Sequence, residues 1–163
     1  MKTPTSRPRA PLFTIGYEQA TQHAVLDELK AATVELVIDT RAVTASRRPG
    51  FSKRQLAASL ADCGIDYLHL RGLGTPAEGR QAARSGRFAD LFRIYERHLA
   101  TPEARHELDV LTALAKASRE RSGRPLCLLC YERDPAYCHR SRLAAELDAR
   151  LGLKVEHLCC APV

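Results

Sequence analysis

The chain has 163 residues, of which 45% are apolar and 27% charged, and its formal net charge is +6. These values are typical of a globular protein with a real hydrophobic core, and the mild basicity is compatible with anionic partners. Six cysteines in so long and helical a chain do not indicate a disulfide scaffold, so we expect reduced thiols and a cytoplasmic protein. No segment is long enough to span a membrane.

Residues 1–11, MKTPTSRPRAP, are predicted to form a disordered basic tail. They contain prolines and arginines and lack the apolar h-region of a secretory signal. Residues 12–163 show no internal repeat and no linker, so we expect them to form a single α/β domain.

Apolar runs and helical spacings alternate along the chain. Short apolar runs predict strands, and apolar residues three and four apart predict helices. The expected strands are 12–15, 34–38, 65–70, 126–130 and 154–159, and the expected helices are 20–31, 52–63, 88–98, 101–120 and one that begins at Asp134-Pro135. The polar stretch 77–87 is expected to be irregular. This alternation is typical of a three-layer α/β fold with a mainly parallel, doubly wound sheet of about five strands.

The stretch PLCLLCYERDPAYCHRSR, residues 125–142, is the most informative part of the sequence. A buried strand leads through a polar loop into a helix, with Asp134 as N-cap and Pro135 at the first helical position. The first turn of this helix is then expected to carry Cys138, His139 and Arg140. Free backbone N–H groups and the positive end of a helix dipole beside an arginine are suited to hold an anion.

Arg140 shares its predicted helical stripe with Ala144 and Leu147, which places it on the core side of the helix. A buried guanidinium must find a carboxylate, a carbonyl or a bound anion. The sequence leaves two roles open, which can also hold together. Arg140 either pairs with Asp39 or Glu132 and braces the loop, or it contacts a ligand.

Polar or glycine-bearing turns follow four of the predicted strands, and in open α/β sheets ligands bind beyond the carboxyl ends of the strands. We therefore expect a pocket at this edge. The predicted ligand-binding residues are Gly16, Tyr17, Arg41, Cys130, His139 and Arg140. Tyr17 is expected either to stack on a ligand or to pack at the rim. His139 lies off the Arg140 stripe, so it is expected to face the loop or solvent.

The predicted catalytic residues are Cys138, Glu132 and Asp39. A helix dipole can lower the pKa of the Cys138 thiol and make it a nucleophile, although a small packed residue is the alternative. Glu132 and Asp39 are candidates for a general base, or for carboxylates that hold Arg41 and Arg140 in place.

The cysteines do not predict a metal site. Cys127 and Cys130 lie three apart in a strand, so they point to opposite faces and cannot chelate one ion together. A site formed by Cys130, Cys138 and His139 would need a fourth ligand or an open position. We therefore expect no metal and no cofactor, and Cys130 is expected to pack in the core. A reversible disulfide between Cys130 and Cys138 depends on geometry that the sequence does not show.

Five segments together resemble a known family: TIGY (14–17), DTR (39–41), SRRPGF (46–51), GIDYLHLRGLG (64–74) and LCYERDPAYCHRSRLA (129–144). They are similar to the domain-of-unknown-function family numbered 488, with its Cys-x-Glu and Cys-His-Arg signature at residues 130–132 and 138–140. The resemblance implies a single α/β domain and brings no established reaction. The family's usual Leu-Gly-Gly is Leu73-Gly74-Thr75 here, so the backbone freedom of the third glycine is lost.

Three functions are compatible with these patterns. The first is a pocket for a small anionic ligand of the phosphate or nucleotide type, either in an enzyme or in a sensor, although no Gly-x-Gly-x-x-Gly or Walker motif is present. The second is a nucleic-acid-associated module that uses the tail and the basic run 41–54, which is otherwise a solvated face. The third is a redox or metal-responsive protein built on Cys130 and Cys138. The sequence assigns no substrate, reaction, strand order or oligomeric state.

Overall fold

The structure, a computed structural model, describes residues 10–120 and 124–163. Five parallel strands form one sheet in the order β3-β2-β4-β1-β5. The strands are β1 (Leu12–Gly16), β2 (Leu36–Asp39), β3 (Asp66–His69), β4 (Leu126–Cys130) and β5 (Val155–Leu158). The helices are α1 (Gln22–Ala31), α2 (Lys53–Asp62), α3 (Ala77–Arg84), α4 (Phe88–Leu99), α5 (Pro102–Glu120) and α6 (Arg140–Leu151), with short 3₁₀ turns η1 (Arg71–Leu73) and η2 (Pro135–Tyr137).

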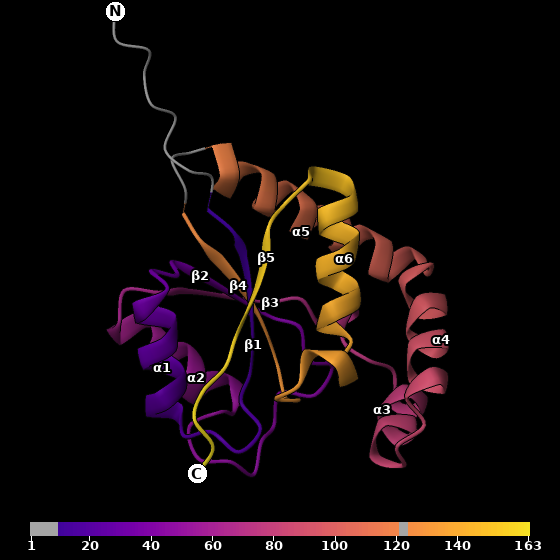
Figure 1. The fold of residues 1–163 in the computed structure, drawn as a ribbon, viewed down its shortest axis with the longest axis horizontal. Helices are drawn as coiled ribbons and strands as arrows, with labels where there is room; N and C mark the ends of the chain where they lie inside the picture. The colour runs from indigo at the N-terminus through magenta and orange to yellow at the C-terminus, as the bar shows by residue number, and fades with distance from the viewer. Residues whose placement is uncertain (1–9, 121–123) are drawn as a thin grey trace, which may run out of the picture.

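Helices cover both faces of the sheet, which confirms the predicted three-layer, doubly wound α/β fold. Figure 1 shows α1 and α2 on one face and α5 and α6 on the other. Successive residues of β4 alternate between the two cores: Cys127 and Leu129 pack toward α1 and α2, while Leu126 and Leu128 pack toward α5 and α6. Burial on both faces explains why this strand is apolar throughout.

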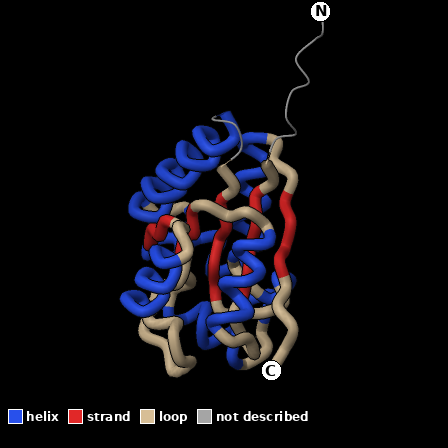
Figure 2. Tube along the Cα trace, turned by 90° about the vertical axis from the view of Figure 1, so that its left-hand side faces the viewer, coloured by secondary structure: helices blue, strands red, loops and turns tan. Residues whose placement is uncertain are grey.

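The neighbouring strands β1 and β4 create a crevice at the carboxyl edge of the sheet. They are paired in register from Phe13 opposite Cys127 to Gly16 opposite Cys130. The chain leaves β1 toward α1 on one face and leaves β4 toward α6 on the other. Such a switch point is where open α/β sheets bind their ligands. Figure 2 shows the loops gathered beyond this end of the strands.

The structure corrects the expectation that residues 77–87 are irregular, because residues 77–84 form α3. Only the small residues Gly79 and Ala82 are buried on this helix, which packs against α4. A stripe of small residues permits close helix packing, but it leaves no large apolar periodicity for a sequence pattern to show.

The start of α6 also differs from the prediction. Asp134 does act as a cap, since its side chain accepts a hydrogen bond from Ala136 N, but it caps the single 3₁₀ turn η2. Cys138 then adopts an extended conformation, with φ −127° and ψ 142°, and α6 begins only at Arg140. Cys138 therefore precedes the helix instead of lying in its first turn.

The other predicted elements are confirmed, with ends that shift by at most two residues. Residues 1–9 of the predicted basic tail lie outside the described residues. Among the residues that are described, no helix combines the length and the apolar character needed to cross a bilayer.

Gly74 generates a prediction about stability. A Cβ atom added there would lie 2.2 Å from the backbone nitrogen of Ala42, so the loops after β2 and β3 could not approach each other as they do. We expect Gly74→Ala to destabilise the protein by about 3 kcal/mol in urea denaturation.

Gly86→Ala is the matched control. It has a positive φ of 71° but nothing within 4 Å of the added atom, so only the backbone strain of about 1 kcal/mol applies. Equal costs for the two variants would contradict the proposed close approach at Gly74.

Candidate functional site

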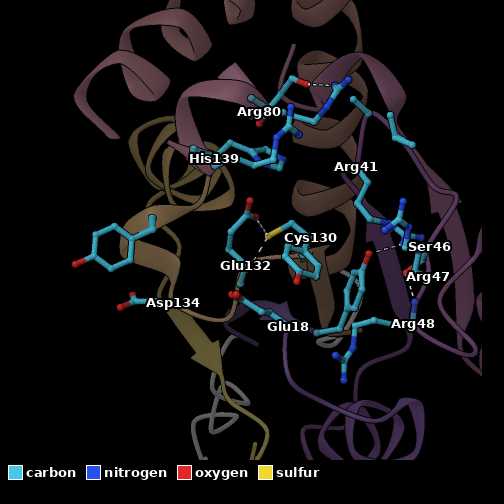
Figure 3. A pocket seen from close by; sticks show the side chains of 18 of the residues that line it. Glu18, Arg41, Ser46, Arg47, Arg48, Arg80, Cys130, Glu132, Asp134 and His139 are labelled. Carbon is cyan, nitrogen blue, oxygen red and sulfur yellow. Dashed lines mark hydrogen bonds between the residues drawn. The ribbon is translucent and has the colours of Figure 1, made fainter. Parts of the chain in front are cut away.

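A cavity of about 880 Å³ lies at the carboxyl edge of the sheet. The loops after β1, β2 and β4 form its floor and one side, and α3 with the start of α4 forms another side (Figure 3). Five of the residues singled out in the sequence line it: Tyr17, Arg41, Cys130, Glu132 and His139. The other four, Gly16, Asp39, Cys138 and Arg140, lie behind this lining.

Arg140 is completely buried beneath the cavity. Its Nη1 donates to the carbonyl oxygen of Glu132, its Nη2 to that of Arg133 at 3.0 Å, and its Nε to the hydroxyl of Thr14 at 3.1 Å. Nη1 also lies 2.9 Å from the sulfur of Cys130. The brace role is therefore observed, but through backbone carbonyls and not through the carboxylate of Asp39 or Glu132. Burial lowers the pKa of Arg140 from its usual value.

Gly16, at the end of β1, lies against the loop that connects β4 to α6. A Cβ atom there would clash with the carbonyl group of Glu132 and would come within 3.0 Å of Nη1 of Arg140. The absence of a side chain at Gly16 lets the β4–α6 loop close over the buried guanidinium.

Asp39 forms a buried ion pair with Arg41. Its two carboxylate oxygens accept hydrogen bonds from Nε and Nη2 of Arg41 at 2.9 and 2.7 Å, and Tyr67 donates its hydroxyl to the same carboxylate at 2.5 Å. Arg41 also donates through Nη1 to the hydroxyl of Tyr17 at 2.9 Å and to the carbonyl of Phe51 at 2.8 Å. Burial opposes the charge on Arg41, but the bonds and charge of Asp39 outweigh it and raise the pKa of Arg41.

Cys130 and Glu132 lie side by side at the centre of the cavity (Figure 3), and the Cys130 thiol is 3.6 Å from a carboxylate oxygen of Glu132. Burial raises the pKa of Glu132. Behind them, the sulfur of Cys138 is in contact with that of Cys130 and accepts a hydrogen bond from the backbone N–H of Arg140 at 3.5 Å. The first amide of α6 thus still acts on Cys138, although this cysteine precedes the helix.

His139 is buried, so of the two environments expected for it, loop or solvent, the structure excludes solvent. Burial lowers its pKa to about 4, so the ring is neutral at pH 7. Nε2 lies 3.0 Å from the carbonyl oxygen of Thr40, which can only accept, so this nitrogen carries the proton. The lone pair of Nδ1 therefore faces the sulfur of Cys138 at 3.7 Å.

Four further arginines form a basic wall, which we define as Arg47, Arg48, Arg80 and Arg84. None of them forms an ion pair with a described residue. The side chain of Arg48 donates one hydrogen bond to the backbone carbonyl of Ala20 at 2.6 Å. The side chain of Arg80 donates one to the backbone carbonyl of Thr75 at 2.8 Å.

Sequence reasoning missed Arg80 and Arg84, because they belong to the helix that was expected to be irregular. The available signal was their spacing of four residues immediately after Pro76, a combination that is typical of the start of a helix with one basic face.

Aromatic side chains flank the cavity. Tyr17 stacks on Phe51, with ring centroids 4.2 Å apart, and Tyr131 meets Tyr17 edge-on. Tyr137 packs on Phe88 at the other rim, with centroids 4.4 Å apart. Tyr131 and Tyr137 are about half exposed. Rings that are packed on one side and open on the other can stack on a planar ligand.

The fold and site together define an all-parallel α/β protein with a cavity at its switch point, containing buried thiols, a carboxyl group and a basic wall. The family model described as "Domain of unknown function DUF488" matches residues 21–147, and the chain belongs to this family. No match was found among curated proteins or among solved structures.

The buried pair of Asp39 and Arg41 yields a direct test. Asp39→Asn leaves the guanidinium of Arg41 buried without its counter-charge, so we expect a loss of about 3–5 kcal/mol in the free energy of unfolding by urea denaturation.

Asp27→Asn is the control, since Asp27 pairs with Lys30 on the exposed side of α1 and should cost less than about 1 kcal/mol. A cost for Asp39→Asn as small as that of the control would show that the buried pair does not stabilise this edge of the sheet.

Proposed function

We propose that the cavity binds a small anionic ligand of the phosphate or nucleotide type. The observation that carries this proposal is the basic wall. Four arginines from two separate segments, the loop after β2 and helix α3, face one cavity, and none is neutralised by a carboxylate of the described chain. The carboxyl groups of Glu18, Glu132 and Asp134 also line this cavity, but none of them pairs with a wall arginine, and the four arginines outnumber them. An excess of positive charge that converges on a cavity raises the local concentration of anions and favours their binding.

The distribution of the remaining charges supports this proposal. Arg41 and Arg140 are already satisfied by Asp39 and by backbone carbonyls, so they position the floor and are not free for a ligand. The four arginines of the basic wall have no carboxylate partner among the described residues and can contact a ligand. Our proposal therefore assigns ligand contacts to the basic wall and gives Arg140 a positioning role.

The aromatic rim favours a ligand that carries a ring beside its phosphate. Tyr131 and Tyr137 are about half exposed, and both line the same cavity as the basic wall. A nucleotide offers a base for stacking and a phosphate for the arginines. The proposal therefore takes a nucleoside phosphate as its first probe.

The floor offers chemistry as well as binding. A thiol, a carboxyl group whose pKa is raised by burial and a neutral imidazole all line the cavity, from Cys130, Glu132 and His139. Such groups are used in nucleophilic and acid–base catalysis. The ligand is then a substrate if the protein is an enzyme, and we assign no reaction.

Isothermal titration with ADP tests the proposal. The side chains of Arg47 and Arg84 make no hydrogen bond or ion pair to another described residue, so Arg47→Gln and Arg84→Gln should leave the fold intact. We expect each to weaken ADP binding about tenfold, the loss of one charge-assisted contact of about 1.4 kcal/mol. Adenosine, which lacks the phosphates, should bind more weakly than ADP to the wild-type protein.

Arg54→Gln is the matched control, because Arg54 is exposed on α2 in the basic run 41–54 but does not line the cavity. It should bind ADP like the wild type. Equal weakening by Arg54→Gln and Arg47→Gln, together with steeply salt-dependent binding of a single-stranded oligonucleotide, would instead favour the nucleic-acid alternative. Equal affinity for ADP and adenosine would contradict a phosphate site.

A further inference from the structure

We propose that Cys130, Glu132 and Cys138 bind one Zn²⁺ ion at the floor of the cavity. The two thiol sulfurs and a carboxylate oxygen all lie within 4.8 Å of one another. They come from two segments, the end of β4 with the loop after it and the residue that follows η2. Two thiolates and a carboxylate are a donor set that suits Zn²⁺, which takes Cys, His and acidic ligands.

Two N–H groups of Arg140 point at the sulfurs and favour thiolates, whereas the lone pair on Nδ1 of His139 faces the sulfur of Cys138 and favours its protonated form until a cation binds. Arg140 directs Nη1 at the sulfur of Cys130 at 2.9 Å, and its backbone N–H, the first of α6, points at the sulfur of Cys138 at 3.5 Å. A cationic donor and a helix N-terminus both stabilise the deprotonated form of a thiol. Two thiolates in contact repel each other unless they bind a cation between them or form a disulfide.

The backbone geometry favours the cation over the disulfide. The Cα atoms of Cys130 and Cys138 are 7.7 Å apart. Disulfides span about 4.4–6.8 Å between Cα atoms, so closing one here would require the backbone to move. Two cysteines that bind the same zinc ion hold their sulfurs roughly 3.7 Å apart, as Zn–S bonds of about 2.3 Å require. The sulfurs of Cys130 and Cys138 would therefore have to separate from their present contact, but the Cα distance would need no shortening.

Glu132 supplies the third ligand and completes the charge balance. Its carboxylate forms no ion pair with the described residues, and its hydrogen-bond partner is the Cys130 thiol itself. Once both thiols are deprotonated, the carboxylate and the sulfurs need a positive partner. A doubly charged ion together with the guanidinium of Arg140 balances two thiolates and one carboxylate.

The placement of the three ligands leaves the ion open on one side. Cys130 and Glu132 line the cavity, whereas Cys138 lies behind them. His139 is not within reach of the whole group, so the fourth position faces the cavity and not a protein side chain. Three protein ligands with one open position are typical of catalytic zinc sites, whereas structural sites have four.

Metal analysis of the full-length protein, purified under reducing conditions and dialysed against ZnCl₂, tests this inference without any anionic ligand. Its failure is therefore distinct from a failure of anion binding. We expect about one zinc per chain. Cobalt substituted at the site should give the thiolate-to-cobalt absorption that only sulfur ligation produces. Cys130→Ser and Cys138→Ser should abolish that band.

Glu132→Gln keeps both thiols and should lower the cobalt affinity more than about tenfold. Cys159→Ser is the matched control, because Cys159 is an exposed free cysteine outside the group and should retain full metal content. Circular dichroism establishes that each variant is folded.

Two results would overturn the proposal. One is a folded wild-type protein that takes up neither zinc nor cobalt while Cys130 and Cys138 react as free thiols. The other is an intact mass two hydrogens lower, with both cysteines unreactive, which would establish a disulfide in place of the metal.

Discussion

The buried guanidinium of Arg140 is the interaction on which the carboxyl edge of the sheet depends. A charged group that is not exposed to solvent must be surrounded by hydrogen-bond acceptors. The chain supplies them by folding the loop after β4 back over the start of α6. This closure presses the carbonyl of Glu132 against Gly16, which tolerates no side chain. One buried cation thus fixes the end of β1, the end of β4 and the start of α6 relative to one another, and it sets Cys130 and Glu132 at the cavity floor.

Arginines serve two different purposes in this protein. Arg41 and Arg140 are satisfied within the chain and hold the floor in shape. The basic wall of Arg47, Arg48, Arg80 and Arg84 surrounds the cavity without carboxylate partners among the described residues. In our account the wall attracts an anion, and the floor holds a zinc ion whose open position faces the same space. The two proposals are complementary, since a metal ion next to the wall would add to the attraction for an anionic ligand.

The sequence predicts the architecture well, because each strand and most helices carry their own periodicity. It also predicts the burial of Arg140, since this residue shares a stripe with Ala144 and Leu147. The partners of Arg140 could not be predicted, because they are backbone carbonyls that any residue can supply. The sequence did not predict helix α3, because this helix packs through Gly79 and Ala82 instead of large apolar side chains. Arg80 and Arg84, which form half of the basic wall, were therefore not predicted either. The contact between Cys130 and Cys138 depends on the extended backbone at Cys138, which the Asp134-Pro135 helix-start signal obscured.

In our proposal, three separate segments form one anion-binding site at the edge of the sheet. Hydrogen–deuterium exchange of the full-length protein with and without saturating ADP tests it most directly, because it reports on each segment at once. We expect residues 41–48, 75–84 and 131–139 to gain protection together, while α2 and the far ends of the strands do not change. Protection confined to α2, or no protection in any of the three segments, would contradict it.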